Sequence, residues 1–344
     1  MQAIVLVGGE GTRLRPLTET VPKPALTLVD RPFLAYMIEW LAGHGVTEVV
    51  LACGFLPDVL REALAGEEER AGVTIRYVVE PERRGTAGAI RFAADELGDD
   101  LDDSFLALNG DVLTDLDLGA LLQSHANHGS GAPYPRMGGK RRTGTEARAT
   151  IALHPVEDSA AYGLVRTGDD GAVLEFLEKT GERAPGEINA GMYVLERSVL
   201  ELVPPGEEVS IERDVFPRLV GDGLHGLRLD GYWMDIGTPE RYLQASWDIL
   251  ERRVQTRVEP TAPGMLVSAG AEVARGATVG PRAVIGRGCR IADGAEIRDS
   301  VVLDGCTVGE GARVSDSILS AGVEVAPGAS LDGAVVGRDE RVPS

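Results

Sequence analysis

The segment from Gly8 to Pro24 has the clearest chemical character in the sequence. It reads GGEGTRLRPLTETVPKP, a glycine-rich loop followed by the cations Arg13, Arg15 and Lys23. Glycines let backbone N–H groups turn toward phosphate oxygens. Arg13 and Lys23 can neutralise the charge on a triphosphate and on a pyrophosphate leaving group. The segment therefore predicts phosphate handling.

The charged and amide residues are used unevenly along the chain. The net charge is 34 − 54 = −20, which disfavours binding to nucleic acids and to anionic membranes, so a phosphate ligand needs a local cationic pocket. Arginine supplies 34 − 3 = 31 of the basic residues. The lysines and asparagines are Lys23, Lys140, Lys179, Asn109, Asn127 and Asn189. An ammonium and a guanidinium are not interchangeable in a crowded phosphate site, which gives a physical reason for retaining Lys23 and Lys179, while Lys140 is the exception. A heat-adapted source and genomic base bias each also explain the scarcity of lysine and asparagine.

Strand-like and helix-like segments alternate in the first part of the chain. Apolar runs predict strands at 3–7, 46–54, 73–80, 104–111 and 149–156. Amphipathic segments predict helices near 33–43, 57–65, 87–97 and 117–128. This alternation predicts an α/β fold with a Rossmann-like, doubly wound and mostly parallel sheet. The glycine-rich loop follows the first strand, and such folds bind ligands at the carboxyl ends of their strands.

A different pattern begins near residue 260, where an aliphatic residue recurs about every six positions. The repeat starts with Val273, Val279, Ile285, Ile291 and Ile297 and continues to Val336. Three hexads make one coil, and stacked coils bury an aliphatic ladder, so we expect a left-handed parallel β-helix of hexapeptide repeats. We therefore place a catalytic domain at 1–240, a connecting helix and linker at 241–262 and the β-helix at 263–344.

The lengths of the apolar segments and the spacing of the cysteines indicate the cellular compartment of the protein. No stretch reaches the roughly 18 apolar residues of a membrane span, and no charged segment precedes the short apolar run near the N-terminus. We therefore expect a cytoplasmic protein. Cys53, Cys289 and Cys306 stand at unrelated spacings, which indicates buried thiols rather than a disulfide framework or a zinc site.

The opening segment resembles the signature of the sugar-phosphate nucleotidylyltransferases, GGxGTRLxPLT followed by PKP. In particular, the chain resembles the mannose-1-phosphate guanylyltransferases, also called GDP-mannose pyrophosphorylases. The resemblance covers nearly the whole chain, including the hexad region. Its other blocks are GTAGA (85–89), LNGD (108–111), EK (178–179), INAGMY (188–193), SIERDVFP (210–217) and GYWMDIGTP (231–239).

The chain departs from the family pattern at two places. The family usually has proline after EK, where this chain has Thr180. Residues 130–146 look like an insertion, rich in glycine, proline and arginine and longer than an ordinary connection. Because this loop enters a strand at the amino end of the sheet, we expect it to be solvated rather than to clamp a ligand.

The resemblance implies a metal and a set of catalytic residues. Asp111 and Asp235 would hold Mg²⁺, which favours carboxylate and water oxygens and can bridge the α-phosphate and the leaving pyrophosphate. For Asp111 by itself, a helix or turn cap is the alternative. The implied catalytic residues are Arg13, Lys23 and Asp111.

The resemblance also implies two binding groups. The nucleotide-binding residues are Leu6, Gly8, Gly9, Gly11, Thr12, Arg13, Lys23, Glu80, Gly85, Thr86 and Asn109. The residues that bind the sugar phosphate are Gly163, Glu178, Lys179 and Asn189. In the second group, Gly163 leaves room for the sugar ring and Lys179 pairs with the phosphate. Glu178 and Asn189 would bind sugar hydroxyls.

Glu80 bears on the choice of base. It stands at a strand end where relatives that use pyrimidine nucleotides tend to carry glutamine. Guanine offers two adjacent donors, N1–H and N2–H, and a carboxylate accepts both but repels the carbonyls of uracil and thymine. Glu80 therefore favours guanine. The alternative is that Glu80 caps a turn with Pro81.

These observations predict an enzyme that joins a nucleoside triphosphate to a sugar 1-phosphate and releases pyrophosphate. GTP and mannose 1-phosphate, giving GDP-mannose, are the expected substrates. Glucose 1-phosphate with dTTP, UTP or ATP, and a heptose phosphate with GTP, are alternatives within the class. The attacking phosphate oxygen is ionised at neutral pH, so in-line displacement needs no general base.

Two alternatives come from other classes of protein. A non-catalytic regulatory subunit that binds sugar nucleotides would tend to lose signature residues, which this chain keeps. An acyltransferase built on the hexads would need a catalytic histidine, and residues 260–344 contain none. We therefore interpret the β-helix as a stabilising or oligomerising module and expect a homo-oligomer through its aliphatic end coils.

Overall fold

A computed structural model describes residues 1–128, 146–178, 181 and 183–344. The chain divides into two compact units. The first comprises 1–9, 37–57 and 65–233, and the second comprises 10–36, 58–64 and 234–344. No helix among the described residues is long and apolar enough to cross a membrane. The expected domain boundaries at 240 and 262 stay a prediction.

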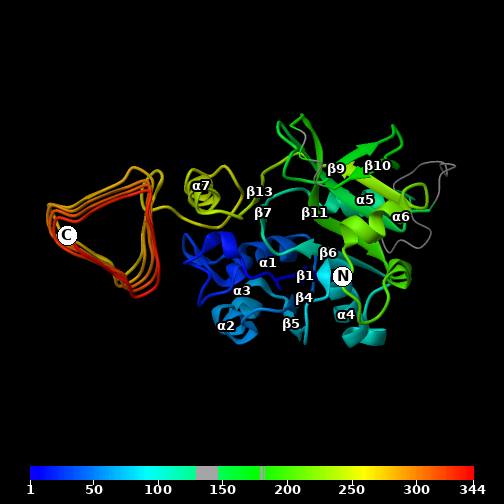
Figure 1. Ribbon diagram of the computed structural model, residues 1–344, viewed down its shortest axis with the longest axis horizontal. Helices are drawn as coiled ribbons and strands as arrows, with labels where there is room; N and C mark the ends of the chain where they lie inside the picture. The colour runs from blue at the N-terminus through cyan, green and yellow to red at the C-terminus, as the bar shows by residue number, and fades with distance from the viewer. Residues whose placement is uncertain (129–145, 179–180, 182) are drawn as a thin grey trace. The chain divides into compact units, whose positions relative to one another are not determined.

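A nine-stranded sheet forms the centre of the first unit (Figure 1). Its parallel part contains β1 (Gln2–Leu6), β4 (Glu48–Cys53), β5 (Thr74–Val79) and β6 (Ser104–Asn109). β1 pairs in parallel with both β4 and β6, and β5 pairs with β4. Leu6 is level with Ala52 and with Asn109, so the loops after β1, β4 and β6 leave the sheet at one edge. The predicted strands and the parallel arrangement are confirmed.

The rest of the sheet is mixed, because β11 runs antiparallel to β6. The additional strands are β8 (Ala149–Val156), β9 (Leu164–Thr167), β10 (Val173–Leu177), β11 (Gly186–Glu196) and β12 (Leu224–Arg228). β8 lies between β11 and β12, antiparallel to the first and parallel to the second. The pairing of β11 with β8 shifts register between Asn189 and Tyr193, as a β-bulge does.

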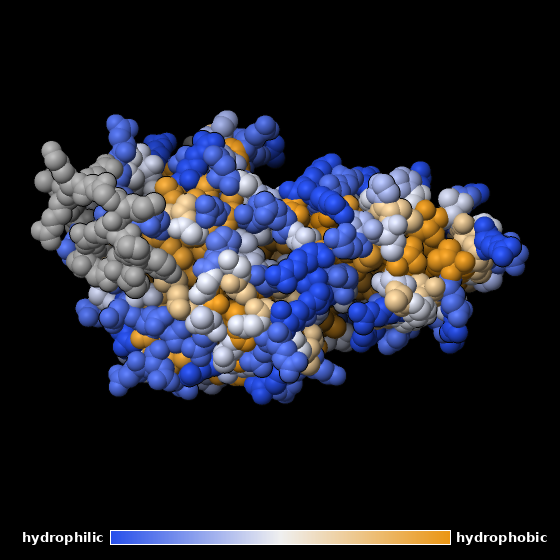
Figure 2. All heavy atoms as spheres, turned by 180° about the vertical axis from the view of Figure 1, so that it is seen from behind, coloured by the Kyte–Doolittle hydropathy of each residue, from blue (hydrophilic) through white to orange (hydrophobic). Residues whose placement is uncertain are grey.

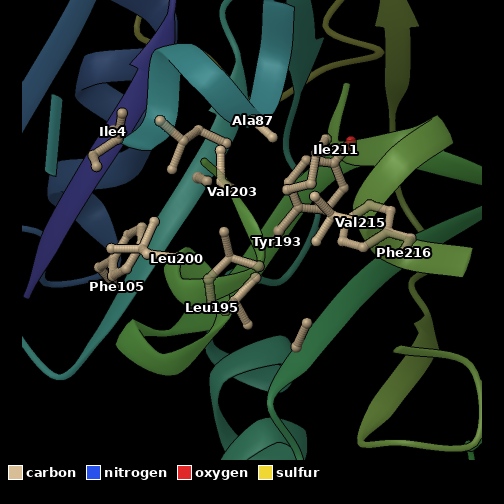
Figure 3. Close-up of a cluster of buried hydrophobic side chains, with 14 of the residues drawn as sticks. Ile4, Ala87, Phe105, Tyr193, Leu195, Leu200, Val203, Ile211, Val215 and Phe216 are labelled. Carbon is tan, nitrogen blue, oxygen red and sulfur yellow. The ribbon is translucent and has the colours of Figure 1, made fainter. Parts of the chain in front are cut away.

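The described residues form the helices α1 (Phe33–Gly43), α2 (Pro57–Ala63), α3 (Glu67–Ala71), α4 (Gly85–Leu97), α5 (Leu118–His128), α6 (Phe216–Leu219) and α7 (Pro239–Leu250). Four of these helices, α1, α2, α4 and α5, agree with the predicted amphipathic segments, whereas the short helices α3 and α6 were not predicted. Apolar residues of α4 face β1 and β4 and join a large buried cluster with Phe105 and Phe216. Figure 3 shows this cluster, in which Tyr193 lies among Ile211, Val215 and Phe216.

The second unit contains a three-sided coil of short parallel strands, drawn in orange and red in Figure 1. One side consists of β14 (Met265–Val267), β17 (Ala283–Ile285), β20 (Ser300–Val302), β23 (Ile318–Leu319) and β26 (Val335–Val336). The next consists of β15 (Glu272–Val273), β18 (Arg290–Ile291), β21 (Thr307–Val308), β24 (Glu324–Val325) and β27 (Arg341–Val342). The third consists of β16 (Thr278–Val279), β19 (Glu296–Arg298), β22 (Arg313–Ser315) and β25 (Ser330–Asp332). The predicted left-handed parallel β-helix is confirmed.

The interior of the β-helix is the aliphatic ladder that the hexads predict. Ile285, Ile291 and Ile297 are buried together with their counterparts in the following coils. Ion pairs join outward-facing side chains of successive coils, as in Glu324 with Arg341 at 2.9 Å. Figure 2 shows hydrophilic side chains over much of the visible surface, with apolar atoms gathered on part of the β-helix.

All three cysteines are free and buried, which confirms their interpretation as core thiols. Cys289 and Cys306 belong to the β-helix interior, and Cys53 ends β4. Four further short strands of the described part of the chain lie outside the nine-stranded sheet and the β-helix. They are β2 (Thr27–Leu28), β3 (Arg31–Pro32), β7 (Val112–Thr114) and β13 (Trp233–Asp235).

Candidate active site

The loop after β1 lies against the loop after β4 in the first unit. A Cβ atom added to Gly8 would lie 3.4 Å from the Gly54 nitrogen, and one added to Gly54 would lie 3.1 Å from the Gly8 oxygen. The two backbones therefore approach too closely for ordinary side chains to fit easily. Gly54 was not among the predicted site residues. The signal for it was its place directly after a buried strand.

Glu80 follows β5 and borders the same loop. Its Oε1 atom lies 3.5 Å from the position of a Cβ on Gly8, and its backbone N–H donates to the Cys53 carbonyl at 2.8 Å. Burial raises the pKa of the Glu80 carboxyl, and the backbone N–H of Arg84 and the charges of Arg84 and Arg83 oppose that rise. The predicted base-reading residue thus lies beside the predicted phosphate loop, and the alternative role as a turn cap is compatible with the Arg84 contact.

The end of β6 brings Asn109 and Asp111 to this edge. Gly110 donates its N–H to the Leu6 carbonyl at 2.9 Å. A Cβ on Gly110 would lie 2.7 Å from that same carbonyl oxygen, so only glycine lets the chain pass so close to β1. Asn109 lies against Gly191 of β11, with its Nδ2 atom 2.7 Å from the position of a Cβ there. Asp111 follows directly and is half-buried.

The block GTAGA begins α4 and is fixed to the segment that precedes α6. A Cβ on Gly85 would lie 2.6 Å from the Val209 carbonyl oxygen. The Thr86 hydroxyl donates to Glu212 Oε2 at 2.8 Å and accepts from the Ile211 N–H at 2.8 Å. The Thr86 side chain is therefore engaged within the protein. Glu212 was not predicted as a site residue, although it lies in the recognised block SIERDVFP.

Three of the four residues predicted for the sugar phosphate lie together. A Cβ on Gly163 would lie 2.7 Å from Glu178 Oε2, and the Asn189 N–H donates to the Gly163 carbonyl at 2.8 Å. The Trp233 indole N–H donates to the Ala190 carbonyl next to this group at 2.9 Å. Lys179, like residues 130–145 of the predicted insertion, lies outside the described residues.

Buried Tyr193 connects these groups. Burial raises the pKa of its phenol well above the usual range, and the negative charges of Glu212, Glu178 and Asp111 each add to the rise. Carboxylates from three motif blocks therefore influence the Tyr193 phenol. The sequence showed Tyr193 only as an apolar member of INAGMY.

The remaining part of the glycine-rich opening belongs to the second unit. A Cβ on Gly11 would lie 3.0 Å from the Thr18 methyl group and 3.2 Å from Lys23 Cβ. The Thr18 hydroxyl donates to the Gly11 carbonyl at 2.8 Å. Thr12 and Arg13 form a short 3₁₀ turn with Leu14, and both are exposed. Lys23 is largely buried, with its Cβ atom beside Gly11.

Asp235 lies beside two guanidinium groups in the second unit. A Cβ on Gly237 would lie 2.8 Å from Arg13 Nη2 and 3.3 Å from Asp235 Oδ2. Arg241 forms an ion pair with the Asp235 carboxylate, and Thr238 caps the helix that carries Arg241. Arg13 and Asp235, which were predicted separately as site residues, thus border one glycine. Arg241 was not predicted, because its position after GTPE carries no distinctive motif.

Whether the protein can hold a metal ion depends on which of its side chains could act as ligands. Among the described residues, no group of three or more His, Cys, Asp or Glu side chains is arranged to hold a metal ion. Mg²⁺ in phosphoryl-transfer sites usually takes one or two carboxylates together with substrate phosphates and water. Asp111, at the edge of the sheet, and Asp235, beside Arg13, are carboxylates of that kind. Asp111 belongs to the first unit and Asp235 to the second, and their joint assignment to Mg²⁺ stays a prediction.

The fold and these groups define a nucleotide-handling α/β enzyme. Residues 2–252 match the family described as nucleotidyl transferase, and residues 261–343 match the GMPPB C-terminal domain. The chain belongs to the nucleotidyl transferase family. Nucleotidyl transferases of this family typically use a divalent metal.

Relatives that match most of the chain are named for the same activity. The mannose-1-phosphate guanylyltransferase of Mycobacterium tuberculosis is 38% identical over 317 residues, which cover 88% of this chain and 80% of that protein. A probable mannose-1-phosphate guanylyltransferase of rice, Oryza sativa, is 37% identical over 311 residues, which cover 88% and 81%.

Solved structures agree with the fold. HddC from Yersinia pseudotuberculosis matches with a TM-score of 0.59 and 26% identity, over 72% of this chain and 99% of that chain. A second structure of HddC, complexed with GMP-PN, matches with a TM-score of 0.58.

Proposed function

We propose that the chain transfers the guanylyl group of GTP to mannose 1-phosphate, forming GDP-mannose and releasing pyrophosphate. The observation that carries the choice of base is the Glu80 carboxylate beside Gly8, at the edge where β1, β4 and β5 end. A carboxylate there accepts from the N1–H and N2–H groups of guanine and disfavours the carbonyls of uracil and thymine. The names of the relatives, and the HddC complex with GMP-PN, support the same base.

The phosphates of GTP would meet the glycine-rich opening. Gly8, Gly9 and Gly11 present backbone N–H groups, and Arg13 and Lys23 offset the charge that builds on the leaving pyrophosphate. Leu6, Thr12, Gly85, Thr86 and Asn109 complete the proposed nucleotide site. Since the Thr86 hydroxyl is engaged by Glu212 and Ile211, we assign Thr86 a role in shaping the backbone of this site.

Mannose 1-phosphate would lie beside Gly163, Glu178 and Asn189. The missing side chain of Gly163 makes room for the ring, and the Glu178 carboxylate and the Asn189 amide bind its hydroxyls. Lys179 pairs with the phosphate. The support for this assignment is that Gly163 contacts both Glu178 and Asn189.

The reaction is a direct displacement. An ionised oxygen of the sugar phosphate forms a bond to the α-phosphorus of GTP, the bond from that phosphorus to the β-phosphate oxygen breaks, and pyrophosphate leaves. Asp111 and Asp235 would hold Mg²⁺, which lowers the repulsion between the reacting oxyanions. Arg13, Lys23 and Asp111 are the proposed catalytic residues. No protein group needs to remove a proton.

Pyrophosphate release across a grid of substrates tests this proposal. The grid crosses GTP, dTTP, UTP and ATP with mannose 1-phosphate, glucose 1-phosphate and a heptose 1-phosphate. We expect the highest kcat/KM for GTP with mannose 1-phosphate. A preference for another pair would replace the proposed substrates, and no release with any pair would favour a regulatory subunit. Cytoplasmic location and homo-oligomerisation stay predictions.

A further inference from the structure

Asn189 and Tyr193 lie on either side of the irregularity in β11. The register shift between them is of the kind that re-aims side chains at functional sites. Gly191, inside the shift, has a φ of +74°, a conformation that residues with a side chain rarely adopt. The bulge places Gly191 against Asn109 and accompanies a contact between the Asn189 amide and the Tyr193 hydroxyl.

Two hydrogen bonds fix the orientation of the Asn189 amide. The Gly191 backbone N–H donates to Asn189 Oδ1 at 2.9 Å, and Asn189 Nδ2 donates to the Tyr193 hydroxyl oxygen at 2.9 Å. A backbone N–H can only donate. The oxygen of the amide must therefore face Gly191, and its nitrogen must face Tyr193.

Tyr193 is itself held rigidly. Its side chain is fully buried, and its ring meets that of Phe216 edge to face at 5.0 Å between centroids. Figure 3 shows the ring packed among Ile211, Val215 and Phe216. Burial and the surrounding carboxylates keep the pKa of the phenol high, so the hydroxyl stays neutral. A fixed, neutral acceptor of this kind can hold the amide in one orientation.

We propose that Tyr193 is a positioning residue for the sugar phosphate, which it serves by locking the Asn189 amide in the orientation that binds a sugar hydroxyl. This inference rests on the proposed role of Asn189. Tyr193 touches no substrate itself. It acts through Asn189. Substitution of Tyr193 therefore weakens the binding of the sugar phosphate and leaves the binding of the nucleotide unchanged.

Tyr193→Phe tests the inference, because it removes the acceptor and keeps the buried ring. The assay uses the full-length enzyme with the sugar phosphate and the triphosphate that the wild type prefers. A neutral hydrogen bond contributes about 1 kcal/mol, so we expect KM for the sugar phosphate to rise about fivefold while KM for the triphosphate stays constant. Tyr36→Phe is the matched control, since Tyr36 is buried and bonds to the Leu28 carbonyl and to Asp30, both at 2.8 Å.

A double-mutant cycle separates positioning from general stability. If Tyr193 acts through Asn189, Tyr193→Phe adds nothing to KM for the sugar phosphate in an Asn189→Ala background. Additive effects, an equal rise in both KM values, or no rise would overturn the inference while leaving the wild-type activity and the proposed function intact. A wild type that releases no pyrophosphate with any substrate pair would overturn both.

Discussion

The edge of the nine-stranded sheet and the β-helix both use glycine, for different reasons. At the sheet edge, a Cβ on Gly163 would lie 2.7 Å from Glu178 Oε2, so the glycine protects the space around one functional side chain. In the β-helix, Gly288, Gly311 and Gly328 have positive φ and nothing within 4 Å of the Cβ position. Those glycines stand in the turns that connect successive sides of the coil.

The difference shows which changes each region tolerates. Each site residue at the sheet edge occupies a position that no other residue can take over, so its substitution lowers the activity. Each β-helix residue has counterparts in neighbouring coils, and repeat architectures distribute their stability over many similar interfaces. We therefore expect substitutions at the sheet edge to alter catalysis with little effect on folding, and substitutions in the β-helix to do the reverse.

Asp111→Asn gives the largest expected effect on activity. The amide is nearly the same size but cannot supply the charge that a divalent metal needs, so pyrophosphate release should fall by roughly 100-fold or more. Thermal unfolding should be unchanged, with Asp99→Asn, at an exposed turn, as the matched control. If the Asp111→Asn variant released pyrophosphate at nearly the wild-type rate, Asp111 would not be a catalytic residue.

Gly163→Ala and Gly288→Ala compare the two regions directly. At Gly163 the added methyl group would lie against Glu178 Oε2 and displace that carboxylate. We therefore expect KM for the sugar phosphate to rise about tenfold, which corresponds to about 1.4 kcal/mol of lost binding free energy. At Gly288, where φ is +64°, alanine should lower the free energy of unfolding by about 1 kcal/mol through backbone strain. KM values should not change there. Equal effects of the two variants on KM would contradict the expected difference between the sheet edge and the β-helix.

Glu80→Gln tests the assignment of the base. The amide presents one acceptor and one donor where the carboxylate presents two acceptors, so kcat/KM for GTP relative to dTTP or UTP should fall about tenfold, as for one lost charge-assisted hydrogen bond. Substrate competition assays give this ratio directly. An unchanged ratio would show that Glu80 only caps the turn before Arg84.

A smaller effect follows from the raised pKa of Glu80. Burial favours its protonated form, and a protonated carboxyl no longer accepts both guanine donors. KM for GTP should therefore rise as the pH falls through this pKa, which lies above the ordinary value for glutamate. The same titration with Glu80→Gln corrects for protonation of GTP itself. Parallel curves for the two enzymes would contradict the prediction.

The sequence predicted those features that depend on local pattern. The hexads located the β-helix interior at Ile285, Ile291 and Ile297 because a strict repeat leaves a strict spacing. The apolar runs located β1, β4 and β6. Tyr193 and Glu212 could not be found in this way, since their roles arise where β11 and the segment before α6 meet α4, and no sequence spacing encodes that meeting. The bulge at Gly191 was hidden for the same reason.

A competition between all substrates tests the central claim most directly. The wild-type enzyme would receive equal concentrations of GTP, dTTP, UTP and ATP, equal concentrations of mannose 1-phosphate, glucose 1-phosphate and a heptose 1-phosphate, and Mg²⁺. Mass spectrometry would then identify the sugar nucleotides formed. We predict that GDP-mannose dominates from the earliest time points. A product with another base or another sugar would contradict the assignment of Glu80 or of the group around Asn189.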